Sequence, residues 1–149
     1  MLATDDASGA SKRFDSRVEL VAPNVVLIAV EGYLEAATGH SLAAALDRRL
    51  EASRGSVHVF CDVERVDNYH SDVRTEMTRV LLAHRPKIAS MQVLVRSKIV
   101  KMGVAVANLS LGDLIRSCES RSAFEGALAQ AKAEGGRGSN EPDGEPPSK

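Results

Sequence analysis

Residues 57–61 read VHVFC, and together with VVLIAV at 25–30 and MQVLV at 91–95 they decide which fold this sequence predicts. Each stretch is a short apolar run, rich in β-branched residues, which is typical of a strand that is buried on at least one face. A segment with the apolar spacing of a helix follows each of them. Because every such helix must bury its apolar face, the pattern predicts an α/β domain with helices packed on an open sheet.

The N-terminal part of the pattern predicts a hairpin and then a helix. Residues 17–22 alternate between apolar and polar side chains, as an edge strand does, and Pro23-Asn24 provides a tight turn into the strand at 25–30. Leucines spaced along one face predict a helix over about 36–53, which Gly55 ends.

Two more helices are expected on either side of the strand at 91–95. Helical spacing from Val73 to His84 predicts the first, which Pro86 ends. Ser97 is a suitable N-cap for the second. This second helix carries one apolar face that we expect to pack on the sheet, formed by Ile99, Met102, Val106 and Leu109.

A short strand and a last helix complete the domain. Leu114, Ile115 and Cys118 indicate a fifth strand, and Ser122 with Glu125 forms a capping-box pattern that would open the helix. The apolar residues of this helix are Phe124, Ala127, Leu128 and Ala131. The predicted order is ββαβαβαβα, with a mixed four- to five-stranded sheet and helices mainly on one face.

Length and composition predict one folded unit of residues 17–132, between disordered tails at 1–16 and 133–149. The tails combine Gly, Ser, Pro and charge without apolar periodicity. The 149-residue chain has 19 basic and 20 acidic residues, so its net charge of −1 gives no field that would attract nucleic acid. The sequence shows no signal peptide pattern and no apolar run of about 18 residues, which favours a cytoplasmic location.

The order of elements, the strand that ends in Phe60-Cys61-Asp62 and the loop to residues 68–72 (NYHSD) resemble a STAS domain, the fold of bacterial anti-sigma factor antagonists. The segment at 97–103 (SKIVKMG) resembles the divergent STAS/SEC14-like group. The resemblance covers about 17–132. It implies a non-enzymatic binding module with a regulatory protein partner, and a cytoplasmic, bacterial signalling role.

The resemblance also implies a switch serine at the start of the helix after the third strand, which falls at or beside Ser71. A helix N-terminus favours added negative charge, so a phosphate at Ser71 would alter a docking surface. The alternative is that Ser71 only caps the helix, because the family's glycine after the serine is missing and Asp72 stands there. The residues expected to bind the partner are Asp62, Tyr69, His70, Ser71, Asp72 and Arg74.

Tyr69 is the strongest single candidate for a partner contact, since aromatic side chains are enriched at the energetic centres of interfaces. Its alternative is a ring that folds back over the edge of the sheet. A second candidate site binds an anion at the start of the helix after Ser97, with Ser97, Lys98 and Lys101 beside Arg96. The alternative there is an ordinary solvated helix start.

The sequence gives little support for a catalytic site or a metal site. His70, Ser71 and Asp72 are adjacent, but neighbours on a helix or turn point in different directions and cannot form a triad. Cys61 and Cys118 are expected to be buried small hydrophobes. We therefore expect no enzyme, no metal and no cofactor.

Two functions remain open. The first is the regulatory protein interaction module, with self-association through an edge strand as an addition. The second is a carrier or sensor of an apolar small molecule or lipid, because Gly103, Ala105 and Ala107 would leave room beside the sheet.

Overall fold

The computed structural model describes residues 16–140, and side chains as far as residue 135. One mixed sheet carries four α-helices in this part of the chain. The elements, in chain order, are β1 (Ser16–Ala22), β2 (Val25–Glu31), α1 (Ala36–Ala52), β3 (Val57–Arg65), α2 (Ser71–Ala83), a 3₁₀ turn η2 (Arg85–Lys87), β4 (Ile88–Val95), α3 (Lys98–Leu111), β5 (Ile115–Cys118) and α4 (Arg121–Asn140).

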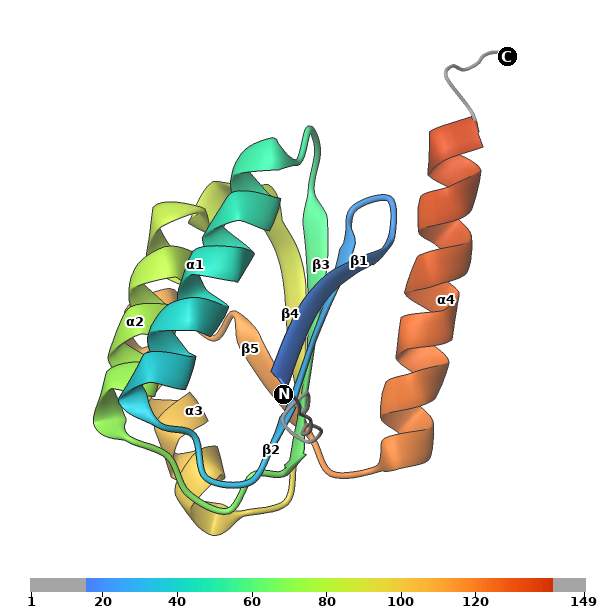
Figure 1. The fold of residues 1–149 in the computed structure, drawn as a ribbon. Coiled ribbons are helices and arrows are strands. Elements are labelled where there is room, and N and C mark those ends of the chain that lie inside the picture. Colours follow the sequence, from blue (N-terminus) through green and yellow to red (C-terminus); the bar gives the residue numbers. More distant parts are fainter. Residues whose placement is uncertain (1–15, 141–149) are drawn as a thin grey trace, which may run out of the picture.

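The sheet has the order β1-β2-β3-β4-β5, in which β1 is antiparallel to β2 and the other neighbours are parallel. Asn24 turns the β1–β2 hairpin with a positive φ of 63°, a conformation that asparagine tolerates. Helices α1, α2 and α3 cover one face of the sheet, and α4 lies alone against the other (Figure 1). The predicted ββαβαβαβα order with helices mainly on one face is confirmed.

Alternation along β3 divides its side chains between two cores. Val57, Val59, Cys61 and Val63 join the larger cluster under α1, α2 and α3. Phe60 points the other way, into a smaller cluster under α4. There its ring meets Phe124 edge to face, with centroids 5.7 Å apart and an interplanar angle of 77°. The apolar run read as one strand therefore serves both faces of the sheet.

The orientation of α3 differs from the sequence prediction. Its buried residues are Val100, Gly103, Ala107 and Leu111. The face predicted to pack on the sheet points to solvent instead, and its exposed fractions are 49% for Ile99, 67% for Met102, 47% for Val106 and 85% for Leu109. Because α3 is apolar on both sides, periodicity could not choose between them, and the side with the smaller residues fits under its neighbours.

The two ends of α4 also differ from the prediction. Ser120 caps the helix, since its Oγ accepts from the N–H of Ala123 at 3.1 Å, so the capping box of Ser122 and Glu125 is not formed. Glu125 binds Arg121 instead, at 2.9 Å. The helix continues to Asn140, so residues 133–140 prolong it rather than beginning a tail. Residues 1–15 and 141–149, in the predicted tails, lie outside the described residues.

In the part of the chain that the structure describes, no helix combines the length and the apolarity that crossing a membrane requires.

Candidate functional site

Backbone hydrogen bonds join the loop before α2 to the connection between β2 and α1. A short parallel bridge joins Leu34 to Tyr69. The N–H of Leu34 donates to the carbonyl of Asn68 at 3.3 Å, and the N–H of His70 donates to the carbonyl of Leu34 at 2.8 Å. These bonds fix the backbone at the start of α2, so the side chains of its first turn have defined positions.

His70 is the N-cap of α2, since its Nδ1 accepts from the N–H of Asp72 at 3.1 Å. The alternative prediction, that Ser71 caps the helix, is therefore wrong. Histidine replaces the usual oxygen acceptor with a ring nitrogen that reaches the same N–H. Ser71 is instead the first residue of the helix and is exposed. Its hydroxyl lies at the positive end of the helix dipole without the capping role.

Titratable side chains of α1 and α2 surround this exposed turn. The imidazole of His40 on α1 lies 3.8 Å from Asp72 Oδ2 and 3.8 Å from Glu76 Oε1. A hydrogen bond from Arg79 lowers the pKa of Glu76. We name the group of His40, His70, Ser71 and Asp72 the switch surface. It combines an exposed hydroxyl with two imidazoles and a carboxylate.

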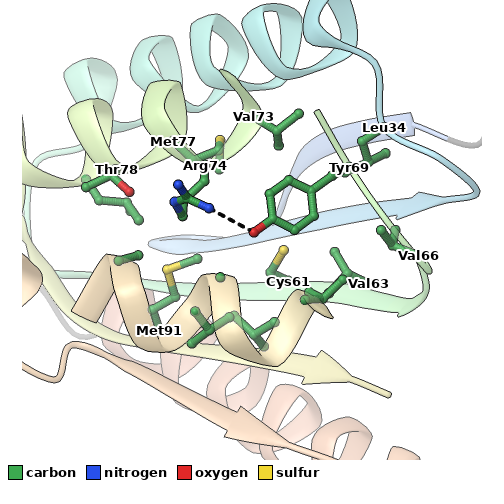
Figure 2. A pocket seen from close by; sticks show the side chains of 16 residues that line it. Leu34, Cys61, Val63, Val66, Tyr69, Val73, Arg74, Met77, Thr78 and Met91 are labelled. Carbon is green, nitrogen blue, oxygen red and sulfur yellow. Dashed lines mark hydrogen bonds between the residues drawn. The ribbon is translucent and has the colours of Figure 1, made fainter. Parts of the chain in front are cut away.

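Tyr69 and Arg74 do not join this surface as the sequence predicted. Figure 2 shows the ring of Tyr69 turned inward beneath α2, where its hydroxyl accepts from Arg74 Nη1 at 3.2 Å. The hydroxyl also lies against Gly103 on α3. The alternative prediction was a ring folded back over the edge of the sheet; the ring does fold back, but it packs against the core between α2 and α3. The ring closes the gap that the small residue at 103 leaves.

An apolar pocket of about 120 Å³ lies behind Tyr69, between α2, α3 and the sheet. Its wall is almost entirely hydrophobic and includes both sulfur-bearing and aliphatic side chains, as Figure 2 shows for Cys61, Met77 and Met91. Burial raises the pKa of the Cys61 thiol to about 12, so this cysteine is an apolar wall residue. Val104 and Ala107 of α3 complete the side opposite the sheet. The pocket fits an apolar group and offers little to a charged one.

Asp62 lies on the other face of the sheet from the switch surface. Its carboxylate binds Arg121 at the start of α4 at 2.9 Å, and Glu64 binds the same guanidinium at 2.7 Å. The hydrogen bond from Arg121, together with the charge of Arg96, lowers the pKa of Glu64. Because strand residues two apart share a face, Asp62 goes with Phe60 toward α4. The predicted partner-binding set is therefore divided among the switch surface, the space beneath α2 and the opposite face of the sheet.

The predicted anion site is not assembled. Ser97 does cap α3, since its Oγ accepts from the N–H of Val100 at 3.3 Å, and it donates to the carbonyl of Asp67 at 2.9 Å. The cations nearby already have carboxylate partners: Arg96 binds Glu64 at 3.2 Å, and Lys101 binds Glu119. Lys98 is the remaining cation of the predicted group and is exposed. An incoming anion would have to compete with two existing ion pairs.

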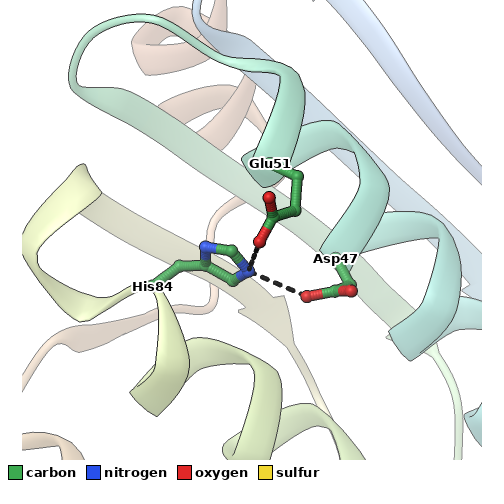
Figure 3. Close-up of side chains that lie close together, drawn as sticks. All are labelled: Asp47, Glu51 and His84. Carbon is green, nitrogen blue, oxygen red and sulfur yellow. Dashed lines mark hydrogen bonds and ion pairs between the residues drawn. The ribbon is translucent and has the colours of Figure 1, made fainter.

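One cluster of metal-ligating residue types joins α1 to the end of α2, and the sequence analysis did not find it. His84 is 8% exposed, and its Nε2 lies 2.8 Å from Asp47 Oδ1 and 3.9 Å from Glu51 Oε2 (Figure 3). The ligand atoms of the three lie within 4.8 Å of one another. The spacing of Asp47 and Glu51, four apart on one helix, was the visible signal. The short hydrogen bond to Asp47 gives this imidazole nitrogen a partner and joins α1 to the end of α2.

The structure is similar to the crystal structure of an uncharacterized protein from the DUF3478 family, with a SpoIIAA-like fold, from Shewanella loihica PV-4. The two share a TM-score of 0.53 at 12% sequence identity, over 76% of this chain and 91% of that one. This chain has a SpoIIAA-like fold. The SpoIIAA-like fold is the STAS fold, so the predicted resemblance is confirmed at the level of architecture. No protein-family model matches the sequence, and no curated protein matches it.

Proposed function

We propose that this chain is a non-enzymatic protein interaction module of the STAS type, which docks a regulatory partner through the switch surface. One observation carries the proposal. His70 takes the capping bond of α2, and Ser71 is left exposed at the first position of the helix. A hydroxyl in this place is accessible to a partner or a kinase, and its modification would not remove the helix cap.

A phosphate on Ser71 would change the charge of the surface by about −1.5 to −2 at neutral pH. The N-terminus of α2 favours that charge, whereas Asp72 opposes it. The surface therefore has two states that differ mainly in charge, which is what a regulated docking surface requires.

The histidines near Ser71 support binding rather than catalysis. A nucleophilic serine needs a base within hydrogen-bond reach and a third group that orients the base. His70 Nδ1 accepts a backbone bond, and His40 lies against the carboxylates of Asp72 and Glu76. Neither imidazole is arranged as a base for Ser71.

A matched pair of charge substitutions tests the proposal. Ser71→Asp adds a carboxylate at the start of α2, and Ser122→Asp adds the same charge near the start of α4, on the opposite face of the sheet. Tagged full-length protein would be used to recover partners from extract of the native organism, with quantitative mass spectrometry. We expect at least one protein that binds the unmodified chain and Ser122→Asp but loses binding to Ser71→Asp. Identical recovery by all three would refute the switch surface.

The apolar pocket favours a second function, the carriage or sensing of an apolar small molecule or lipid chain. Its volume of about 120 Å³ approaches that of engineered apolar cavities that bind benzene. A larger ligand would have to enter past Tyr69 and Val104 and separate α2 from α3.

Benzene is a suitable probe for this second function. Titration followed by ¹H–¹⁵N NMR is expected to shift the amides of Cys61, Gly103 and Ala107 with a saturable dependence. Val104→Phe, which fills the pocket from its mouth, should abolish the shifts while the spectrum stays that of a folded protein. Shifts that are non-saturable, or that survive in Val104→Phe, would exclude the pocket as a binding site.

A further inference from the structure

The outward face of α3 is unusually apolar for a surface helix. Among the described residues, seven large hydrophobic side chains are exposed, and four of them lie on α3: Ile99, Met102, Val106 and Leu109. The opposite face of α3 is buried in the core. A helix that is apolar on both sides is normally covered on both sides. We name this exposed face the α3 stripe. Its composition is that of a surface that packs against a partner.

The spacing of the α3 stripe is that of a helix–helix seam. Its members follow one another at intervals of three, four and three residues, from 99 to 102, 106 and 109. This is the a/d repeat of paired helices. Ala105, exposed beside the middle of the stripe, lets a second backbone approach closely.

The charges at the two ends of α3 are complementary to each other. Lys98 is exposed at its N-terminal end, and Asp113 is exposed just after its C-terminal end. An antiparallel copy of the same helix would place each lysine beside the negative end of the other helix dipole and within reach of the other aspartate. A parallel copy would place like charges together.

We propose that α3 pairs antiparallel with α3 of a second copy of this chain, about a two-fold axis near residue 104. In this register Ile99 faces Leu109 of the second copy, and Met102 faces its Val106. The interface is isologous, so it closes as a dimer. It uses no residue of the switch surface, and it does not depend on the proposed function.

Other occupants fit the α3 stripe less well. A membrane-surface helix typically has many Lys and Arg residues beside its apolar face. Here Lys101 is paired with Glu119 and Arg96 with Glu64, which leaves Lys98. A terminal segment of the same chain would need large apolar side chains to cover the stripe, which has four apolar positions. Residues 141–149 contain no large apolar side chain, and residues 1–15 contain only Met1, Leu2 and Phe14.

Sedimentation velocity of the full chain from 5 to 500 µM tests the dimer. We expect a concentration-dependent shift from monomer to dimer, and Leu109→Glu should weaken the association at least tenfold. Leu82→Glu is the matched control, because Leu82 is an exposed leucine on α2, outside the stripe, and it should leave the dimer unchanged. A chain that stays monomeric throughout, whether or not it binds anionic vesicles, overturns the proposal, as does a dimer that Leu109→Glu leaves intact.

Cysteine cross-linking tests the orientation in a Cys118→Ser background. Ala105→Cys, close to the axis, should form a covalent dimer on mild oxidation. Ile99→Cys should not link to itself but should link to Leu109→Cys when the two variants are mixed. Self-linking of Ile99→Cys, or no link at Ala105→Cys, overturns the antiparallel register.

Discussion

The hydroxyl of Tyr69 lies directly over the Cα of Gly103, so a β-carbon at position 103 would overlap it. This contact joins the loop before α2 to the middle of α3. It also sets how close α3 lies to the sheet and how much room the apolar pocket retains.

Gly103→Ala should destabilise the protein by about 1–3 kcal/mol, as overpacking of a core does. The added methyl group must displace either the Tyr69 ring or α3, and this outweighs the higher helix propensity of alanine. Urea unfolding followed by circular dichroism measures the free energy.

Tyr69→Phe provides the control for that prediction, because it removes the oxygen that the new methyl group meets. Gly103→Ala should cost less in the Tyr69→Phe background than in the native one. An equal cost in both backgrounds would show that the hydroxyl is not the obstacle.

Phe124→Ala should destabilise the protein by about 3–5 kcal/mol, the usual cost of removing a buried phenyl ring. Phe124 is 2% exposed and meets Phe60 edge to face. Hydrogen exchange should rise first in α4. If exchange rises equally in α1, the two faces of the sheet do not unfold separately.

Arg121→Met should lower stability at pH 7, and its effect should shrink in acid. The folded-state pKa of Glu64 lies below its ordinary value of 4.5, mainly through the hydrogen bond from Arg121. A lowered carboxyl pKa stabilises the folded state above the unfolded pKa, and this contribution is lost as the pH falls through the folded pKa. Urea unfolding between pH 7 and pH 3 measures the difference from the native chain.

Arg48→Met is the control for the acid dependence, since Arg48 is an exposed arginine on α1. Its effect should be small and independent of pH. A constant difference between Arg121→Met and the native chain down to pH 3 would count against the role of Glu64.

Cys61 should resist alkylation by iodoacetamide at pH 8 in the folded protein, because burial raises its thiol pKa to about 12. Cys118 is only partly buried and should react. In urea both should react, which mass spectrometry would show as one added group before unfolding and two after it. Rapid modification of Cys61 in the folded chain would mean that the pocket opens to solvent.

The sequence predicted the elements well because contiguous apolar runs and helix signals are local properties. The strands at 25–30, 57–61 and 91–95, and the Ser97 cap, are all present. The buried face of α3 could not be predicted, since both of its faces are apolar and only tertiary contact with Tyr69 selects one.

The candidate site was less accessible to sequence reasoning because its contacts join distant positions. Asp62 and Arg121 are 59 residues apart, and His84 and Asp47 are 37 apart. The sequence indicated that residues 69–72 would lie together at a helix start. It could not show that Tyr69 turns inward while Ser71 stays outside, because that division depends on the fit between α2 and α3.

The position of α4 has a consequence for how this protein would lose its structure. Among the described helices, only α4 packs on one face of the sheet, and an edge-to-face ring contact and a shared arginine hold its first turns. Detachment of that helix would leave the layer of α1, α2 and α3 intact and would expose Phe60 and its neighbours to solvent. The apolar residues of that face would then be exposed to other chains, so the protein's resistance to aggregation depends on how firmly α4 stays docked on the sheet.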